Sequence, residues 1–145
     1  MSAFAPIPAS EILPQRPPFL FVDSIVHYDE AAVRTRFLVK EGGMLLEDSR
    51  LGAAGLLENM AQSSAARTGY ISRFILNIPI RIGYIGAIRG GKIFRLPQVG
   101  ETIETTVSLV QEIENVTMVD VVVRSGDEIL AKANLKTALG QEAAL

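Results

Sequence analysis

The chain has 145 residues, a formal net charge of −2 at pH 7, one histidine and no cysteine. This length is typical of one domain with a sizeable core, and we expect residues 1–145 to form it. The absence of cysteine excludes disulfides, thiolate metal sites and a cysteine nucleophile. A single histidine, His27, excludes a histidine metal cluster, so we expect neither a metal nor a cofactor.

The hydropathy of the chain and its first residues are used to predict its cellular location. The sequence contains no uncharged apolar run of the length that spans a bilayer, so no membrane association is expected. The first residues lack the basic region and the long apolar stretch of a secretory signal. A cytoplasmic protein is therefore the prediction.

Charge is distributed unevenly along the chain. Residues 67–100 hold six bases and no acid. Such a block is either a docking surface for an acidic or phosphorylated partner or a set of dispersed, solvated side chains. Nucleic acid is not an expected partner, because aromatic residues are few and are not interleaved with the bases. The six bases are Arg67, Arg73, Arg81, Arg89, Lys92 and Arg95.

The chain begins with a proline-rich segment. Five of the seven prolines lie in the first 18 residues, and proline removes backbone donors, so residues 1–18 are predicted to be an irregular lead-in. Strand-like runs follow at residues 19–28 and 33–39, where apolar and polar residues partly alternate. A loop with Gly42-Gly43 then leads to the next element.

One long segment, from Gly52 to Gly69, has the composition and period of a helix. Glu58 lies at the border between its apolar and polar faces, one turn before Gln62. A half-buried acid beside small residues suits a substrate channel; alternatively, Gly55 and Ala65 only let a strand pack closely, and Glu58 reaches water. The helical wheel predicts that one arc is buried, formed by Leu56, Leu57, Met60, Ala61, Ser64, Ala65 and Thr68, and that Asn59, Ser63, Ala66 and Arg67 lie opposite.

Four more strands are predicted after the helix, at residues 80–89, 102–113, 116–124 and 129–139. The order of two strands, one helix and four strands predicts an α+β fold, in which an antiparallel sheet of about six strands wraps around one long central helix. Two strands have a clear buried face, formed by Ile103, Thr105, Val107 and Leu109 in one and by Ala131, Ala133 and Leu135 in the other.

This order resembles the hotdog fold, and several motifs are similar to those of the 3-hydroxyacyl-(acyl-carrier-protein) dehydratases. Leu13-Pro-x-Arg-Pro-Pro-Phe-Leu-Phe-Val-Asp23 resembles their N-terminal signature. Leu57-Glu58-x-Met60-Ala61-Gln62 resembles their helix motif, whose acid is catalytic. Leu96-Pro-x-Val-Gly100-Glu matches a third motif only loosely.

A closer resemblance is to the dehydratase-like proteins of aryl polyene pigment pathways. Their acidic loop before the helix is similar to Glu47-Asp-Ser-Arg50-Leu51-Gly-Ala53, and their strand after the helix is similar to Arg81-Ile-Gly-Tyr84. The resemblance therefore implies a role in fatty acid, polyketide or aryl polyene biosynthesis.

The resemblance also implies which residues form the site. Glu58 corresponds to the catalytic acid, and Gln62 is placed to orient it or the substrate. The two family histidines are replaced here by Met44 and Gln15, which become candidate substrate-binding residues. Backbone amides at the helix start are candidate donors to the thioester carbonyl, because helix N-termini carry unpaired N–H groups; they belong to Gly52 and Ala53.

Three functions remain open on this basis. The first is dehydration of a 3-hydroxyacyl thioester with Glu58, its pKa raised by burial, as the acid. Loss of a general base typically costs about 10² to 10⁴ in rate, and His27 is more typical of a surface residue than of a replacement base. The second is a non-catalytic, acyl-binding partner subunit. The third is a thioester hydrolase in which Glu58 activates water.

The resemblance finally implies two partners. Hotdog subunits pair so that each site draws on both chains, which predicts a homodimer or a heteromer with another hotdog dehydratase that supplies the missing histidine. The other partner is an acidic acyl carrier protein with its phosphopantetheine arm. Its predicted docking residues are Arg73, Arg89, Lys92 and Arg95.

Overall fold

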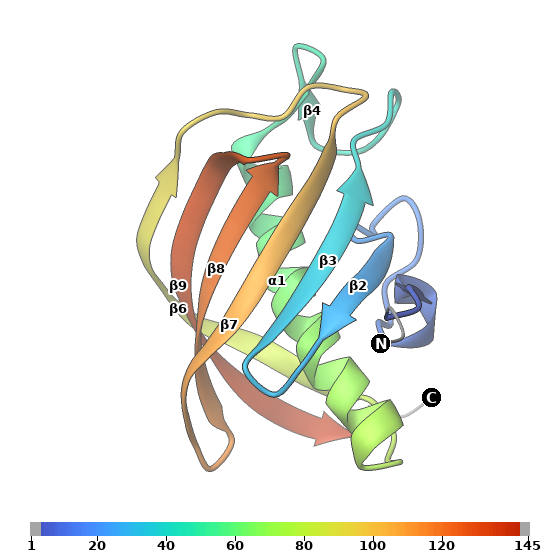
Figure 1. Cartoon of the computed structure of the whole chain (residues 1–145), viewed down its shortest axis with the longest axis vertical. Coiled ribbons are helices and arrows are strands. Elements are labelled where there is room, and N and C mark those ends of the chain that lie inside the picture. Colours follow the sequence, from blue (N-terminus) through green and yellow to red (C-terminus); the bar gives the residue numbers. More distant parts are fainter. Residues whose placement is uncertain (1–3, 143–145) are drawn as a thin grey trace.

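A long helix, α1 (Ala53–Tyr70), lies within a curved antiparallel sheet in the computed structural model, which describes residues 4–142 (Figure 1). The strands are β1 (Ile7–Pro8), β2 (Ser24–Tyr28), β3 (Ala32–Leu38), β4 (Leu46–Glu47), β5 (Arg50–Leu51), β6 (Arg81–Ile93), β7 (Thr102–Ile113), β8 (Val116–Ser125) and β9 (Glu128–Glu142). A 3₁₀ helix (Ala9–Glu11) follows β1, and a π-helical turn (Ile71–Ile75) extends α1.

The main sheet has the order β1-β2-β3-β7-β8-β9-β6, and all neighbours are antiparallel. The chain leaves β3, crosses through α1 to β6 at the far edge, and returns so that β7 pairs with β3. This arrangement confirms the predicted order of two strands, one helix and four strands. Within residues 4–142, two further features were not predicted: the short edge strand β1 and a separate β4–β5 hairpin.

The N-terminal lead-in is more regular than predicted. Ile7 and Pro8 pair with β2, and the following residues form the 3₁₀ helix, so the prediction of an irregular segment was wrong there. Pro8 is tolerated because β1 is an edge strand, where a missing N–H donor need not break a ladder.

The first predicted strand begins later than expected, at Ser24 rather than at residue 19. The reason lies in the bonds that Phe21 makes. Its N–H donates to Gln62 Oε1 at 2.7 Å, and its carbonyl accepts from Asn59 Nδ2 at 2.7 Å. Both backbone groups are therefore bonded to helix side chains and not to a neighbouring strand.

The strand faces follow the predicted alternation. Ile103, Thr105 and Val107 of β7 are each 0% exposed, as are Val121 and Val123 of β8. On β9 the predicted inward residues, which are Ala131, Ala133 and Leu135, are also buried. A period of two was sufficient to predict these faces, because neighbouring residues in a strand point to opposite sides of the sheet.

The helix, however, is rotated relative to the prediction. Asn59, Ser63 and Arg67, which were assigned to the exposed side, are buried, and Leu57 from the predicted buried arc is 41% exposed. Asn59 and Ser63 are tolerated inside because the sheet offers them hydrogen-bond partners, whereas the buried Arg67 Nε has no partner among the described residues. Thr105 Oγ1 donates to Asn59 Oδ1 at 2.6 Å, and the hydroxyls of Thr35 and Ser63 are 2.7 Å apart.

Part of the predicted apolar arc does face the core, since Leu56 and Met60 are 0% and 2% exposed. Ser64 of this arc is also buried, whereas Leu57, Ala61, Ala65 and Thr68 are at most partly covered. In the part of the chain that is described, no helix combines the length and the apolar character needed to cross a bilayer.

Candidate functional site

Glu58 and Gln62 are held together on α1, one helical turn apart. Gln62 is 2% exposed, and its amide nitrogen donates to Glu58 Oε1 at 2.8 Å and to the Phe19 carbonyl at 2.9 Å. Its Oε1 accepts the N–H of Phe21 at 2.7 Å. Both hydrogens and the oxygen of this amide are therefore used, so its orientation is defined by three partners. Glu58 keeps one oxygen, Oε2, that has no hydrogen-bond partner within residues 4–142.

These two residues line a cavity of about 180 Å³ between α1, β6 and β9. We call this cavity the groove. Its walls are mostly small or apolar, and Glu58 is the one titratable group among the described residues that line it. The remaining lining residues are Gln15, Ala61, Ser64, Ala65, Thr68, Gly83, Ile85 and Thr137.

Gln15 reaches the groove because the lead-in runs along α1. The α-carbon of Gly69 lies against the Ile12 backbone carbonyl, and further along the segment the Phe19 carbonyl bonds to Gln62. Gln15 lies between these two anchors. Its Oε1 is buried and has no hydrogen-bond partner in the described part of the chain. The structure thus brings three predicted site residues together: Gln15, Glu58 and Gln62.

The other predicted substrate-binding residues lie elsewhere. Met44 lines a second cavity, of about 160 Å³, which shares no lining residue with the groove. The N–H of Gly52 donates to the Leu45 carbonyl at 2.9 Å, so this amide is already used. Ala53 is exposed in the first turn of α1, where N–H groups lack an intrahelical partner. Within this chain, none of the three lines the groove.

The single histidine is also remote from the groove. His27 Nε2 is 2.7 Å from Asp29 Oδ2, and its side chain is 41% exposed. This contact, together with two backbone N–H bonds, holds the pKa of Asp29 below its usual value. Within residues 4–142, no cluster of three or more histidine, cysteine or acidic side chains is arranged to hold a metal ion.

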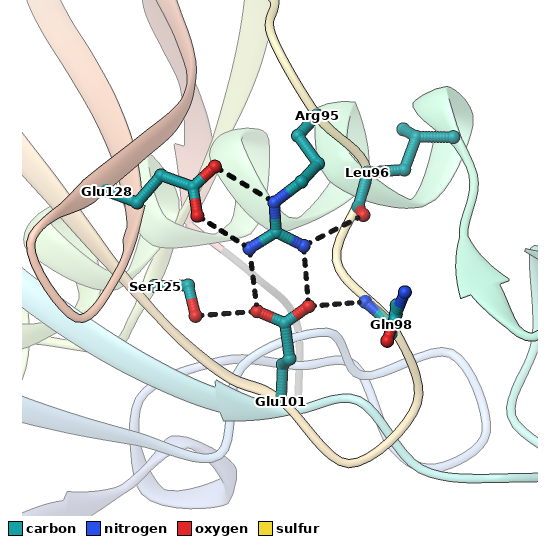
Figure 2. A network of polar contacts seen from close by, with 6 residues as sticks. All are labelled: Arg95, Leu96, Gln98, Glu101, Ser125 and Glu128. Atoms are coloured by element: carbon teal, nitrogen blue, oxygen red, sulfur yellow. Dashed lines mark hydrogen bonds and ion pairs between the residues drawn. The ribbon is translucent and has the colours of Figure 1, made fainter.

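The basic block does not form one continuous surface. Arg67 is buried, and Arg95 binds two carboxylates (Figure 2). Arg95 donates to Glu101 at 2.7 and 3.0 Å and to Glu128 at 2.9 and 3.0 Å. Such bidentate pairs are geometrically specific. Arg95 therefore joins the residue before β7, Glu101, to the first residue of β9, Glu128.

This network shifts the acidity of its members. The Arg95 guanidinium lowers the pKa of Glu101 to about 2, with smaller contributions from the Gln98 N–H and the Ser125 hydroxyl, which lie 2.9 and 2.7 Å from its oxygens. Arg95 likewise lowers the pKa of Glu128. Both acids are ionised over the physiological range, and neither lines the groove.

The other predicted docking residues are more accessible. Arg89 and Lys92 are exposed on β6. Arg73 follows α1, where its Nη1 donates to the Glu11 carbonyl at 2.6 Å and its Nη2 lies 3.6 Å from the Glu11 carboxylate. Arg73 also lines a cavity with Arg16, the residue after Gln15, so it lies near the segment that borders the groove.

Sequence reasoning missed several groove residues. Thr137 on β9 and Ile85 on β6 line it beside α1. Nothing local in the sequence indicates their role, because the pairing of β6 with β9 places them. This register sets Ile85 opposite Thr137. Gly83 did have a signal, since interior strand glycines often mark a close approach of backbone.

The architecture, an antiparallel sheet wrapped around one helix with a carboxylate in a groove beside it, is the hotdog fold. Residues 7–144 match the ApeP-like family, described as ApeP dehydratase. The chain therefore belongs to the ApeP-like dehydratase family. Among curated proteins, none matches this chain.

Solved structures share the fold at low sequence identity. The dehydratase heterocomplex ApeI:P from Xenorhabdus doucetiae is similar with a TM-score of 0.84 and 17% identity, over 93% of this chain and 92% of that chain. Two more distant likenesses are a hypothetical thioesterase with coenzyme A from Streptococcus pneumoniae (TM-score 0.64, 11% identity, 83% and 87% covered) and the E. coli PaaI protein from the phenylacetic acid degradation operon (TM-score 0.61, 14% identity, 79% and 80% covered).

Proposed function

We propose that this protein dehydrates a 3-hydroxyacyl thioester on an acyl carrier protein, with Glu58 as the acid, in a heteromer with a second hotdog dehydratase. The observation that carries the proposal is the Glu58 carboxylate, which Gln62 holds in the groove of a chain that belongs to a dehydratase family. The biosynthetic role, in fatty acid, polyketide or aryl polyene assembly, is part of this proposal and rests on the resemblance.

The proposed step divides the work between two groups. A base removes a proton from the α-carbon, the bond between the β-carbon and the hydroxyl oxygen breaks, and Glu58 gives its proton to the departing oxygen. The products are water and a 2-enoyl thioester. Glu58 is then a carboxylate and regains its proton from the protonated base. Gln62 supports this step by binding Oε1, which leaves Oε2 to carry the proton.

The base comes from the partner subunit in this proposal. Apart from Glu58, the described groove residues are neutral, and none of them can take a proton from carbon. A histidine from a second hotdog chain supplies what is missing. Because the resemblance implies that each site draws on both chains, Met44 and the helix start at Ala53 are proposed to face the groove of the partner.

The partner binds along β6. In the described part of the chain this edge strand pairs only with β9, and its side chains Ile82, Tyr84 and Ile88 are exposed apolar groups. Unpaired edges of this kind accept another strand. Gly83 and Ile85 belong to β6 and line the groove, so a strand added here would lie beside the site.

Charge favours a different chain over a second copy. β6 carries three bases, Arg81, Arg89 and Lys92, and no acid. Pairing β6 with its own copy would place six bases on one two-stranded ribbon, and like charges across strands are destabilising. A partner strand with acidic residues would match them. The heterocomplex formed by the ApeI:P dehydratase is consistent with this preference.

The catalytic proposal is tested with a 3-hydroxyoctanoyl carrier protein and mass spectrometry. The purified chain is incubated alone and together with a histidine-bearing hotdog dehydratase from the same organism. We expect loss of water in the mixture, abolished by Glu58→Gln and retained by Glu41→Gln, a matched change on an exposed loop. Native mass spectrometry of the same mixture is expected to show a mixed oligomer.

Other results would replace this proposal. Release of the free acid, dependent on Glu58, would instead identify a thioester hydrolase. A mixed oligomer that leaves the thioester unchanged, or one whose dehydration is the same with Glu58→Gln, would identify a non-catalytic partner subunit.

Carrier-protein docking is proposed on the exposed bases. Arg73 lies near the groove, while Arg89 and Lys92 extend the positive surface along β6. Charge reversal, as Arg73→Glu or as Arg89→Glu with Lys92→Glu, is expected to weaken carrier binding most at low salt. Lys40→Glu, on an exposed loop outside the block, is the control. Equal affinity in all variants at low salt would remove the docking proposal.

A further inference from the structure

Gln15 has an unmatched hydrogen-bond acceptor beside the proposed catalytic acid. Its Oε1 is buried, and no described residue donates to it. A buried carbonyl oxygen without a donor is unfavourable, so such an atom requires an explanation. Because the terminal amide torsion is broad, this group can turn toward a donor that enters the groove.

Most other polar groups of the groove are already satisfied. The Gln62 amide uses all of its hydrogen-bonding groups, and the Ser64 and Thr137 hydroxyls donate to the Met60 and Thr117 carbonyls at 3.1 and 3.4 Å. Among the carbonyl and carboxylate oxygens of the described groove side chains, Gln15 Oε1 and Glu58 Oε2 accept no hydrogen bond, and Gln15 Oε1 is the buried one. The groove is small, at about 180 Å³, so one bound acyl group can meet both.

We propose that Gln15 is a specificity-determining residue that recognises the 3-hydroxyl of the substrate by accepting its hydrogen. The inference rests on the proposed function of the groove. A hydroxyl fits this pair of oxygens because it both donates and accepts. The hydroxyl donates its hydrogen to Gln15 Oε1. A lone pair of the hydroxyl oxygen then points toward the proton on Glu58.

This arrangement positions the leaving group. The hydroxyl oxygen must accept a proton from Glu58 as the bond to the β-carbon breaks, so its own hydrogen has to point elsewhere. Gln15 accepts the hydroxyl hydrogen in a hydrogen bond and so orients it. It takes no proton itself, since a neutral amide is not a base at neutral pH. The residue thus acts on recognition and orientation, and the proton transfer remains with Glu58.

The inference predicts discrimination between substrates. A saturated acyl group brings no donor, and a 3-oxoacyl group brings only an acceptor, so both leave Gln15 Oε1 unmatched. Sites that bind a substrate hydroxyl reject analogues lacking it, because buried polar groups are then left unpaired. We expect at least about tenfold weaker binding of the saturated and 3-oxo compounds.

The test uses amide analogues of pantetheine thioesters, which carry 3-hydroxyoctanoyl, octanoyl or 3-oxooctanoyl groups and resist turnover. Dissociation constants are measured by calorimetry for the full chain, alone and in its heteromer. The variants are Gln15→Met, which removes the acceptor at similar length, and Gln98→Met, an exposed control. Thermal unfolding of each variant checks that the fold is retained.

We expect the wild type and Gln98→Met to prefer the hydroxy analogue, and Gln15→Met to bind all three within about twofold while keeping its affinity for the octanoyl compound. A preference that survives in Gln15→Met would overturn the inference, and so would tighter binding of the 3-oxo analogue, which would mean that the amide presents its N–H. If the wild type binds none of the acyl analogues, the proposed function fails as well. Binding of acyl groups without a Gln15 effect overturns the inference alone.

Discussion

Replacing Gln62 with leucine tests whether its amide organises the site. The side chain joins α1 to the segment before β2 and to Glu58 through three hydrogen bonds of 2.7 to 2.9 Å. Leucine has a similar size and no polar atoms, so Gln62→Leu removes these bonds with little change in packing volume. The N–H of Phe21 and the carbonyl of Phe19 then lose their partner.

The magnitude follows from the burial of those two backbone groups. The bond to Phe21 is buried and the bond to Phe19 is partly buried. An unsatisfied buried polar group costs about 1–3 kcal/mol, so we expect Gln62→Leu to lower the free energy of unfolding by about 2–4 kcal/mol. The loss of the bond to Glu58 adds little to stability, because the carboxylate can bind water instead.

Urea unfolding at neutral pH measures this quantity, with an unchanged m-value as the sign that the unfolding transition is the same. Ser64→Ala is the matched control on the same helix. Its hydroxyl donates only to the Met60 carbonyl of its own helix turn, so we expect a loss below about 1 kcal/mol. If Gln62→Leu costs no more than this control, the amide does not hold the lead-in, and the argument for an organised site fails.

Three further variants probe other contacts. The pKa of Glu101 is lowered in the folded chain to about 2, so its stabilising contribution is complete above its unfolded pKa near 4.5 and is lost as the pH falls through about 2. Because solvent screens this ion pair, we expect Glu101→Gln to remove about 1 kcal/mol of pH-dependent stability across that window. The urea unfolding curves of the variant and the wild type should therefore converge at low pH. Gly69→Ala places a methyl against the Ile12 carbonyl and should cost about 1–3 kcal/mol, whereas Gly91→Ala, with space around it, should have a much smaller effect in thermal unfolding. Asn59→Leu leaves the Thr105 hydroxyl and the Phe21 carbonyl unmatched, and a loss of about 2–4 kcal/mol is expected; an unfolding free energy equal to that of the wild type would show that these buried bonds contribute nothing.

The sheet was predictable because each strand carries its own signal. On β7, Ile103, Thr105 and Val107 are buried and alternate with less buried residues, and the period alone assigns the inward face. The alternation ends at Leu109, which is only partly buried, and beyond it the pairing of β7 with β8 shifts register between Leu109 and Gln111. A local irregularity of this kind depends on the partner strand and has no signal within one strand.

The helix could not be oriented from its own residues. Asn59 and Ser63 are buried because Thr105 and Thr35, more than 25 positions away, provide hydrogen bonds to them. A helical wheel scores polarity and has no information about partners that arrive from other strands. The same limit applies to Met44, because the β4–β5 hairpin and the loop before it place this residue in a different cavity from Glu58.

The rotation of α1 bears directly on the proposed partner. The sheet provides hydrogen-bond partners for Asn59 and Ser63 on one side of α1. The partly covered side carries Leu57, Glu58 and Ala61, and the last two line the groove. On β6, the exposed apolar residue Ile85 lines the same groove, and apart from Glu58 the described groove residues are neutral and include no catalytic base. An apolar helix side, an unpaired strand edge and an acid without a base each have ordinary explanations alone. One additional hotdog strand along β6 would cover the apolar helix side, pair with the free strand edge and bring a catalytic base to Glu58. For this reason we place the partner on this edge of the molecule.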